Sequence, residues 1–225
     1  MKNHLKIKLG IFVIALTMLS CNLPKGAAVP KTTSLESPTP IAVSVDPSTG
    51  QAYSPARLQV DDLPDGFREL TEQELQDLGL SSSQFTSAFA GMLTNAKPEN
   101  FAAFISTSGS FEVVVSMLMA PLTSLEGAAI DLYLRDPLRF ADDFAAAAGA
   151  SDLMLDEGAL PVGDSSSSVT FSLPDYPLDL NGGITASRNE KVLQIALLFY
   201  PDGSKPVLTS SDVAAIVDAK LTGLE

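Results

Sequence analysis

The chain of 225 residues is predicted to form an α+β fold, in which helices pack on an antiparallel β-sheet. Two kinds of pattern carry this prediction. Apolar side chains alternate with a period of two over 111–119 and 169–173, which is typical of strands. Over 136–148 and 211–222 the apolar side chains instead recur at helical spacing, between capping signals.

The first part of the predicted domain holds a turn and two helices. Leu63-Pro64-Asp65-Gly66-Phe67 is a turn that leads out of a short strand. Thr71 and Glu74 then form a capping box, which predicts a short helix over 72–78. A second helix is expected over 82–95 because its phenylalanines and a methionine share one face.

The middle of the chain changes period twice. Segments 101–107 and 111–119 are strand-like, and the turn Ser108-Gly109 between them predicts a β-hairpin. Helices are expected over 125–134 and from Asp136 to Ala148, with Pro137 in the first turn of the second helix and Gly149 past its end. The cluster Met117, Leu118 and Met119 is expected in the core.

Three more strands are expected, over 169–173, 183–187 and 192–200. The last of them is apolar at nearly every residue, which indicates a central strand that is covered on both faces. The polar turn Arg188-Asn189-Glu190-Lys191 joins it to the strand before. A final helix over 211–222 closes the chain, and segment 158–168, which holds four consecutive serines, is expected to be a flexible loop.

The N-terminus resembles a bacterial lipoprotein signal peptide. Three lysines precede a short apolar run over 9–19, and the only cysteine, Cys21, follows a small residue. The resemblance implies that residues 1–20 are removed and that Cys21 then carries lipid. Ordinary secretion with cleavage after Ala28 is an alternative. An uncut anchor is another, although the run is shorter than the roughly 20 residues that span a bilayer.

Composition divides the rest of the chain into a tether and a domain. Residues 21–57 are rich in Pro, Ser and Thr and have no apolar period, so they are expected to form a semi-extended tether. A single α+β domain is then expected over 58–225. Loss of residues 1–20 changes the formal net charge from −13 to −16. Such acidity argues against nucleic acid as a partner, and it leaves lipid on Cys21 as the contact with the membrane.

The residue types left after cleavage exclude several kinds of chemistry. The only histidine, His4, lies in the predicted signal peptide. The mature chain would therefore lack the imidazole of Ser-His-Asp and Cys-His sites, and a cysteine held by lipid cannot bind zinc or form a disulfide. We expect no enzymatic activity, no metal and no cofactor. The alternative is a carboxylate-dependent hydrolase that uses the doublets Asp142-Asp143 or Asp156-Glu157.

Arg188 is the candidate ligand-binding residue, because it stands beside a turn in a domain with few basic residues. One interpretation makes it a contact for a carboxylate or phosphate. The other makes it a surface ion pair with a nearby acid such as Glu190, which contributes under about 1 kcal/mol.

Two parts of the domain resemble the PsbP-like family of extracytoplasmic accessory proteins. These are the opening Leu63-Pro64-Asp65-Gly66-Phe67 and the closing hairpin, Ile184 to Tyr200, with the helix that follows it. The resemblance implies a layered sheet-and-helix sandwich over residues 63–221 that helps to assemble or stabilise other proteins.

The function expected from these observations is that of a lipid-anchored binding or accessory module. It would stand on the extracytoplasmic face of the cell membrane of a bacterium and bind a protein or a small ligand. A purely structural envelope component remains the third alternative.

Overall fold

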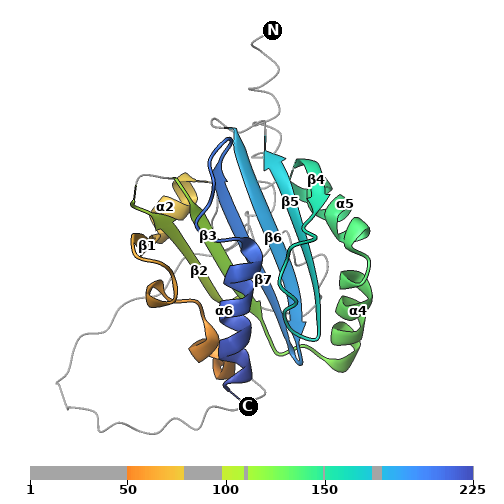
Figure 1. Ribbon diagram of the computed structural model, residues 1–225. Helices are drawn as coiled ribbons and strands as arrows, with labels where there is room; N and C mark the ends of the chain where they lie inside the picture. Colours follow the sequence, from red (N-terminus) through yellow and green to blue (C-terminus); the bar gives the residue numbers. More distant parts are fainter. Residues whose placement is uncertain (1–49, 79–97, 109–110, 149, 174–178, 225) are drawn as a thin grey trace, which may run out of the picture. The chain divides into compact units, whose positions relative to one another are not determined.

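The described strands form one antiparallel sheet of seven in the order β1-β2-β3-β7-β6-β5-β4 (Figure 1). The structure is a computed structural model that describes residues 50–78, 98–108, 111–148, 150–173 and 179–224. All described elements belong to one compact unit, Ser44–Glu225, and the other unit, Met1–Val43, lies outside the described residues. Helices pack on the sheet, so the predicted α+β class is confirmed.

The strands differ in length and burial. They are β1 (Phe67–Glu69), β2 (Pro98–Ser106), β3 (Val113–Met119), β4 (Ser151–Leu155), β5 (Ser165–Leu173), β6 (Leu180–Asn189) and β7 (Val192–Pro201). β7 pairs with β3 on one side and β6 on the other, so three strands flank it on each side. Its residues 192–199 are all buried. The prediction of a central strand, drawn from its continuous apolar run, is confirmed.

β3 shows how one strand supplies two cores. Val113, Val115, Met117 and Met119 belong to the cluster that α4 and α5 also line, which we call the α4 side of the sheet. Val114 and Leu118 belong to the cluster that α6 lines, the α6 side. Successive side chains of a strand point to opposite faces, and both faces here are covered. The expected alternation and the core position of both methionines are confirmed.

Of the described helices, α2 (Glu72–Asp77), α4 (Ser124–Leu134) and α5 (Pro137–Ala148) contribute to the core on the α4 side. The predicted capping box begins α2, since the Thr71 side chain accepts from the Glu74 N–H. Asp136 accepts from the Arg139 N–H at 3.2 Å and so begins α5, as expected. A capping box of Thr123 and Glu126 begins α4 and was not predicted.

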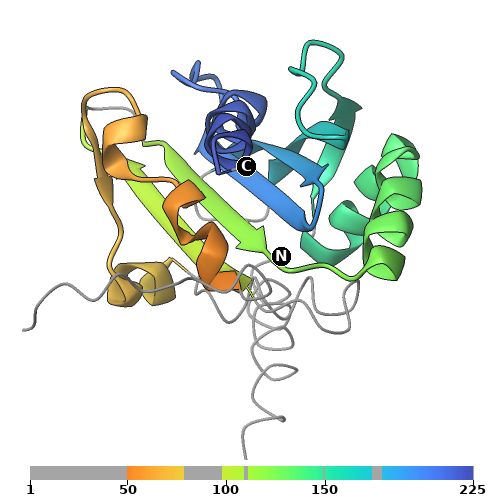
Figure 2. The same ribbon diagram turned by 90° about the horizontal axis from the view of Figure 1, so that it is seen from below.

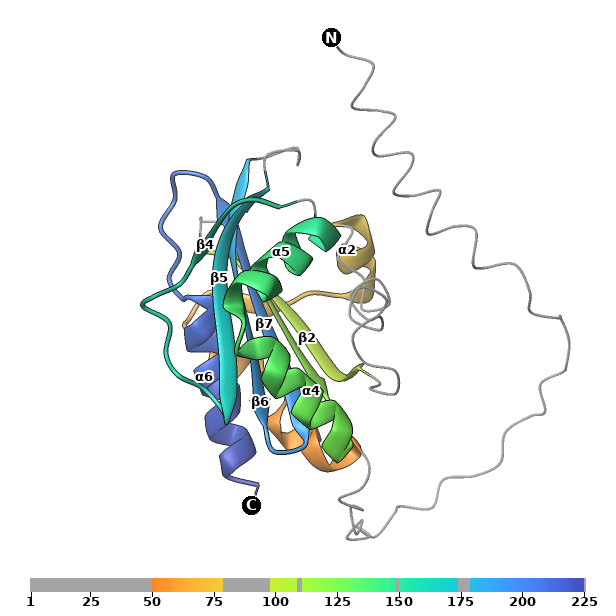
Figure 3. The same ribbon diagram turned by 90° about the vertical axis from the view of Figure 1, so that its right-hand side faces the viewer.

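The α6 side carries η1 (Gly50–Ala56) and α6 (Ser210–Thr222), with η2 (Val60–Asp62) next along the chain after η1. α6 lies across the sheet from α4 and α5 (Figures 2 and 3). Of the four residues expected to face inward from α6, Val213, Val217 and Leu221 are buried and Ile216 is partly buried. Lys220 Nζ donates to the Arg57 carbonyl at 3.1 Å and to Asp62 Oδ2 at 2.5 Å. These bonds join the first described segment to the last helix.

The start of the domain differs from the prediction. Residues 50–56, assigned to the tether, form η1 and pack on α6, and Ala56 is fully buried. The short strand follows the turn at Gly66 instead of preceding it, and Gly66 has a φ of +97° that suits glycine. Composition marks 50–57 as linker, but a few apolar side chains suffice to hold it against α6.

The β5 region differs too. Ser165–Ser168, expected in a flexible loop, pair in register with Arg188–Thr185 of β6, and β4 was not predicted. Runs of serine are common in loops, but here hydrogen bonding to the backbone of β6 makes these residues part of a strand. The four-residue turn is in fact the two residues Glu190-Lys191, because Arg188 pairs with Leu193 and Asn189 with Val192. The predicted signal peptide, Cys21, most of the predicted tether and the predicted helix over 82–95 lie outside the described residues.

Candidate functional site

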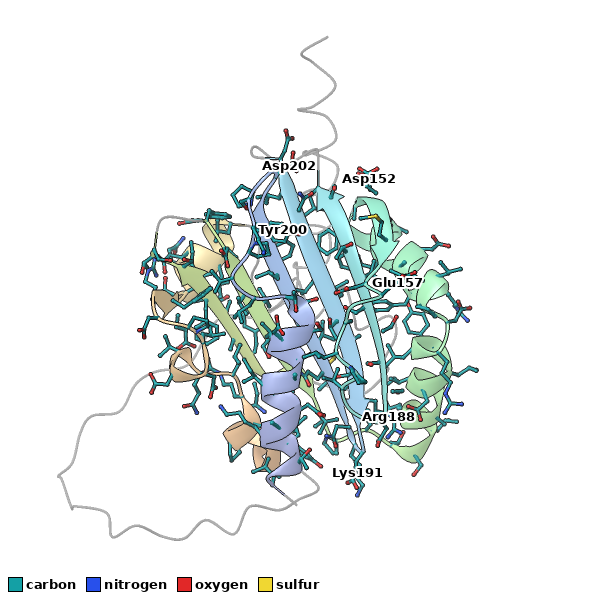
Figure 4. All side chains as sticks on the ribbon, viewed as in Figure 1. Asp152, Glu157, Arg188, Lys191, Tyr200 and Asp202 are labelled. Atoms are coloured by element: carbon teal, nitrogen blue, oxygen red, sulfur yellow. The ribbon has the colours of Figure 1, made fainter. Side chains whose placement is uncertain are left out.

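Arg188 lies at the end of β6, where its backbone pairs with Ser165 of β5 and Leu193 of β7. Its Nε donates to Asp131 Oδ1 of α4 at 2.5 Å, and its Nη2 is 3.1 Å from Asp164 Oδ2. Its Nη1 donates to the Glu190 carbonyl at 2.6 Å. Figure 4 shows Arg188 and Lys191 at one end of the sheet, with Tyr200 and Asp202 toward the other.

The charges of this cluster reinforce one another. The hydrogen bond from Arg188 is the largest cause that lowers the pKa of Asp131, against the opposing effect of burial, and Ser165 Oγ donates to the same oxygen at 2.5 Å. The same bond raises the pKa of Arg188. The side chain of Arg188 is 16% exposed and that of Asp131 is 23% exposed, so water screens the pair only in part.

The structure bears on the two sequence interpretations of Arg188 in different ways. Each of the three guanidinium nitrogens has a partner within the protein, so a bound anion would compete with Asp131 and Asp164, and the anion contact stays a prediction. The ion pair with a nearby acid is present, but its partners are Asp131 and Asp164, and Glu190 contributes its carbonyl oxygen. Asp131 is 57 residues from Arg188 in the chain, so no local pattern pointed to it.

Hydrogen bonds of the Asp164 backbone and side chain support this cluster. The Asp164 N–H donates to the Arg188 carbonyl at 2.7 Å, and Asp164 Oδ2 accepts from the Glu190 N–H at 2.9 Å. Gly163 has a φ of +62°, and a Cβ there would lie 2.2 Å from the Arg188 carbonyl oxygen. Gly163-Asp164 therefore fastens the loop before β5 to the β6–β7 hairpin.

The two carboxylate doublets lie on separate elements. On α5, Asp143 Oδ2 accepts from the Tyr133 hydroxyl at 3.1 Å, while Asp142 is exposed. Burial, and after it this hydrogen bond, raise the pKa of Tyr133. After β4, Asp156 Oδ1 accepts from the Gly158 N–H at 3.2 Å, and Glu157 is exposed. No group of three or more His, Cys, Asp or Glu side chains suited to a metal occurs among the described residues.

Sequence reasoning missed the structural role of Glu112. Its side chain is only 1% exposed, and Oε2 accepts from the Val207 N–H at 3.2 Å. This carboxylate holds the loop between β7 and α6. The sequence signal was available, because an acid that shares a strand face with apolar neighbours calls for a partner.

Hydroxyl groups fasten α6 to the sheet and were also missed. Ser168 Oγ lies 2.8 Å from Thr185 Oγ1, which in turn lies 2.9 Å from Ser210 Oγ at the start of α6. Gln194 Nε2 donates to the Ala214 carbonyl at 2.9 Å. These buried and partly buried polar groups bond to one another and to the backbone, so they stabilise the packing of α6.

The outer surface of α4 is apolar and exposed. Leu125 is 81% exposed and Leu132 is 73% exposed, and Ala128 and Ala129 between them are exposed as well. The spacing i, i+3, i+4, i+7 places these four residues on one helix face, which we call the α4 stripe. The opposite face, with Ile130 and Leu134, is buried against the sheet.

The α4 stripe is free of charge. The two acids of α4 are engaged at its flanks, since Glu126 caps the helix through Thr123 and Asp131 binds Arg188. Sequence reasoning expected a helix here but did not notice that it is apolar on two faces, which is the signal that a helix contacts something on both.

Comparisons with known proteins add no relative. No family model, curated protein or solved structure matches this chain. The resemblance to the PsbP-like family therefore stays a prediction. Among the residues that the structure describes, no helix is both long and apolar enough to cross a bilayer.

Proposed function

We propose that this protein is a lipid-anchored, non-catalytic binding module on the extracytoplasmic face of a bacterial cell membrane, and that it binds a protein through the α4 stripe. The observation that carries the proposal is the exposure of Leu125 and Leu132 on one face of a helix whose other face is already in the core.

Exposure of the apolar side chains of the α4 stripe to water is unfavourable. Single exposed leucines are common and need no explanation, but a contiguous apolar helix face on a soluble domain marks an interaction site. Burial of apolar area stabilises a complex by about 25 cal/mol per Å² before the costs of association. Leu138, 64% exposed near the start of α5, adds a further apolar side chain close to the end of α4.

The polar groups support a binding role more than a catalytic one. Arg188, Asp131 and Asp164 bind one another, and Glu112 and the hydroxyls beneath α6 hold structural elements in place. The N-terminal pattern supports the anchor, because Cys21 follows a signal-like run and a Pro-rich segment separates it from the domain.

A photo-crosslinking experiment on the full chain in its own membranes tests the proposal. A photoreactive residue at position 132 should form a covalent adduct with a protein, whereas one at Val207, which is 60% exposed in the loop before α6, should not. In the same cells, labelled palmitate should enter the parent chain and not Cys21→Ser. Equal adduct yields at the two positions would contradict the binding role, and label in Cys21→Ser would contradict the anchor.

A further inference from the structure

The α4 stripe has an internal symmetry. Its residues, Leu125, Ala128, Ala129 and Leu132, read the same from either end about the midpoint between the two alanines. A two-fold axis through that midpoint, perpendicular to the helix, would exchange Leu125 with Leu132 and Ala128 with Ala129. Self-complementary patches of this kind are what an isologous interface requires.

We propose that the partner bound by the α4 stripe is a second copy of this chain, docked with the two α4 helices antiparallel about that axis. The inference rests on the proposed function of this surface. Leu125 would pack against Leu132 of the second copy at each end. The two alanines at the centre would let the helices approach closely, since the separation of packed helices depends on the side chains at the contact.

Charge favours this face over the rest of the molecule. The chain has a formal net charge of −13, so most surfaces of two copies would repel each other. The exposed side of α4 carries no carboxylate, because Glu126 and Asp131 are held at its flanks.

The small area of the α4 stripe limits the expected affinity of the dimer. A helix of 11 residues is about 16 Å long, and its contact would fall short of the roughly 800 Å² per partner of a standard interface. We therefore expect a weak dimer in dilute solution. Two copies anchored in the same membrane meet at a much higher effective concentration, which would populate the dimer there.

Disulfide trapping in the membrane-bound full chain tests the geometry. Chains that carry Leu125→Cys and chains that carry Leu132→Cys, with different tags, are co-expressed and mildly oxidised. The mixed disulfide should form in at least several-fold excess over either self-disulfide. The reason is that each residue lies near its counterpart of the other type, whereas like residues are separated by about 10 Å along the helices.

Two controls set the background. The parent chain has Cys21 as its only cysteine, and Ala219→Cys places a thiol at an exposed position of α6, on the other side of the sheet. Both should give only background dimer. A second readout avoids thiols and keeps the protein in the membrane. Leu132→Glu should lower the energy transfer between fluorescently tagged full chains in one membrane, and Val207→Glu should not.

The outcomes separate this inference from the proposed function. A mixed disulfide no stronger than the Ala219→Cys background would overturn the inference. So would a dominant Leu125→Cys self-disulfide, which indicates parallel helices. A photo-adduct at position 132 with a different protein, or with lipid alone, would also overturn it. The different protein would leave the binding role intact, whereas lipid alone would remove both.

Discussion

Asp131 is the residue on which the polar cluster at the end of the β6–β7 hairpin depends. It accepts from both Arg188 Nε and Ser165 Oγ, and so joins α4 to β6 and β5. A charge-assisted hydrogen bond at a partly buried site contributes more than an exposed ion pair, because less water competes for the same groups. The cluster thus holds α4 against β5 and β6.

Asp131→Asn should lower the free energy of unfolding by about 1–3 kcal/mol near pH 7, because Arg188 loses its charged acceptor. The folded pKa of Asp131 lies below its ordinary value of 3.8, so the stabilisation is complete above that value and disappears as the pH falls through the folded pKa. Urea denaturation of parent and variant should therefore give curves that differ at pH 7 and converge as the pH falls through the folded pKa of Asp131.

The control for this prediction is Asp142→Asn, an exposed acid of α5, which should change the free energy of unfolding little at either pH. A constant difference between parent and Asp131→Asn down to the lowest pH would show that lost packing, and not lost charge, explains the effect.

Helices and strands differ in how far the sequence predicts them. The ends of α2 and α5 follow local hydrogen bonds, such as that from the Glu74 N–H to Thr71, so a short stretch of sequence contains the information. The ends of β4 and β5 depend on a partner elsewhere in the chain. Ser165–Ser168 become strand only because β6 runs beside them.

Gly163→Ala tests the loop that precedes β5. The substitution should reduce the free energy of unfolding by about 1–3 kcal/mol, since alanine is strained at a φ of +62° and its Cβ would strike the Arg188 carbonyl. Thermal or urea unfolding measures the loss.

Gly158→Ala is the matched control in the same loop. Its added Cβ would meet nothing closer than 3.6 Å, and its φ is not positive. The variant should therefore be as stable as the parent or slightly more stable. If the two alanine variants unfold alike, Gly163 is not the residue that holds the loop to the hairpin.

At the scale of the whole molecule, stability depends on a sheet that is covered on both faces around β7. Leu197 is 1% exposed and lies between Val115 of β3 and Ile184 of β6. Helices on both sides leave the central strand no solvent-facing residue before its last two positions, which suits its continuous apolar sequence.

Leu197→Ala should lower the free energy of unfolding by about 2–5 kcal/mol, because it removes buried methyl groups and leaves a cavity. That is a large share of the stability of an ordinary domain. Denaturant melts should compare it with Leu138→Ala, which truncates a leucine that is 64% exposed and should cost little. An unchanged melting curve for Leu197→Ala would mean that the centre of the sheet tolerates a cavity and that the core lies elsewhere.

Local sequence patterns predict the fold class, the central strand and most helix starts, because alternation, continuous apolarity and capping are properties of neighbouring residues. They also point to Arg188 and, through Cys21, to a membrane anchor that awaits its test. The packed molecule is needed to show which acids bind Arg188, that four serines form part of a strand, and that the second apolar face of α4 is exposed. Each of these features depends on residues that are distant in the chain. Such contacts stabilise the fold only after the sheet has brought the residues together, so no local sequence pattern predicts them.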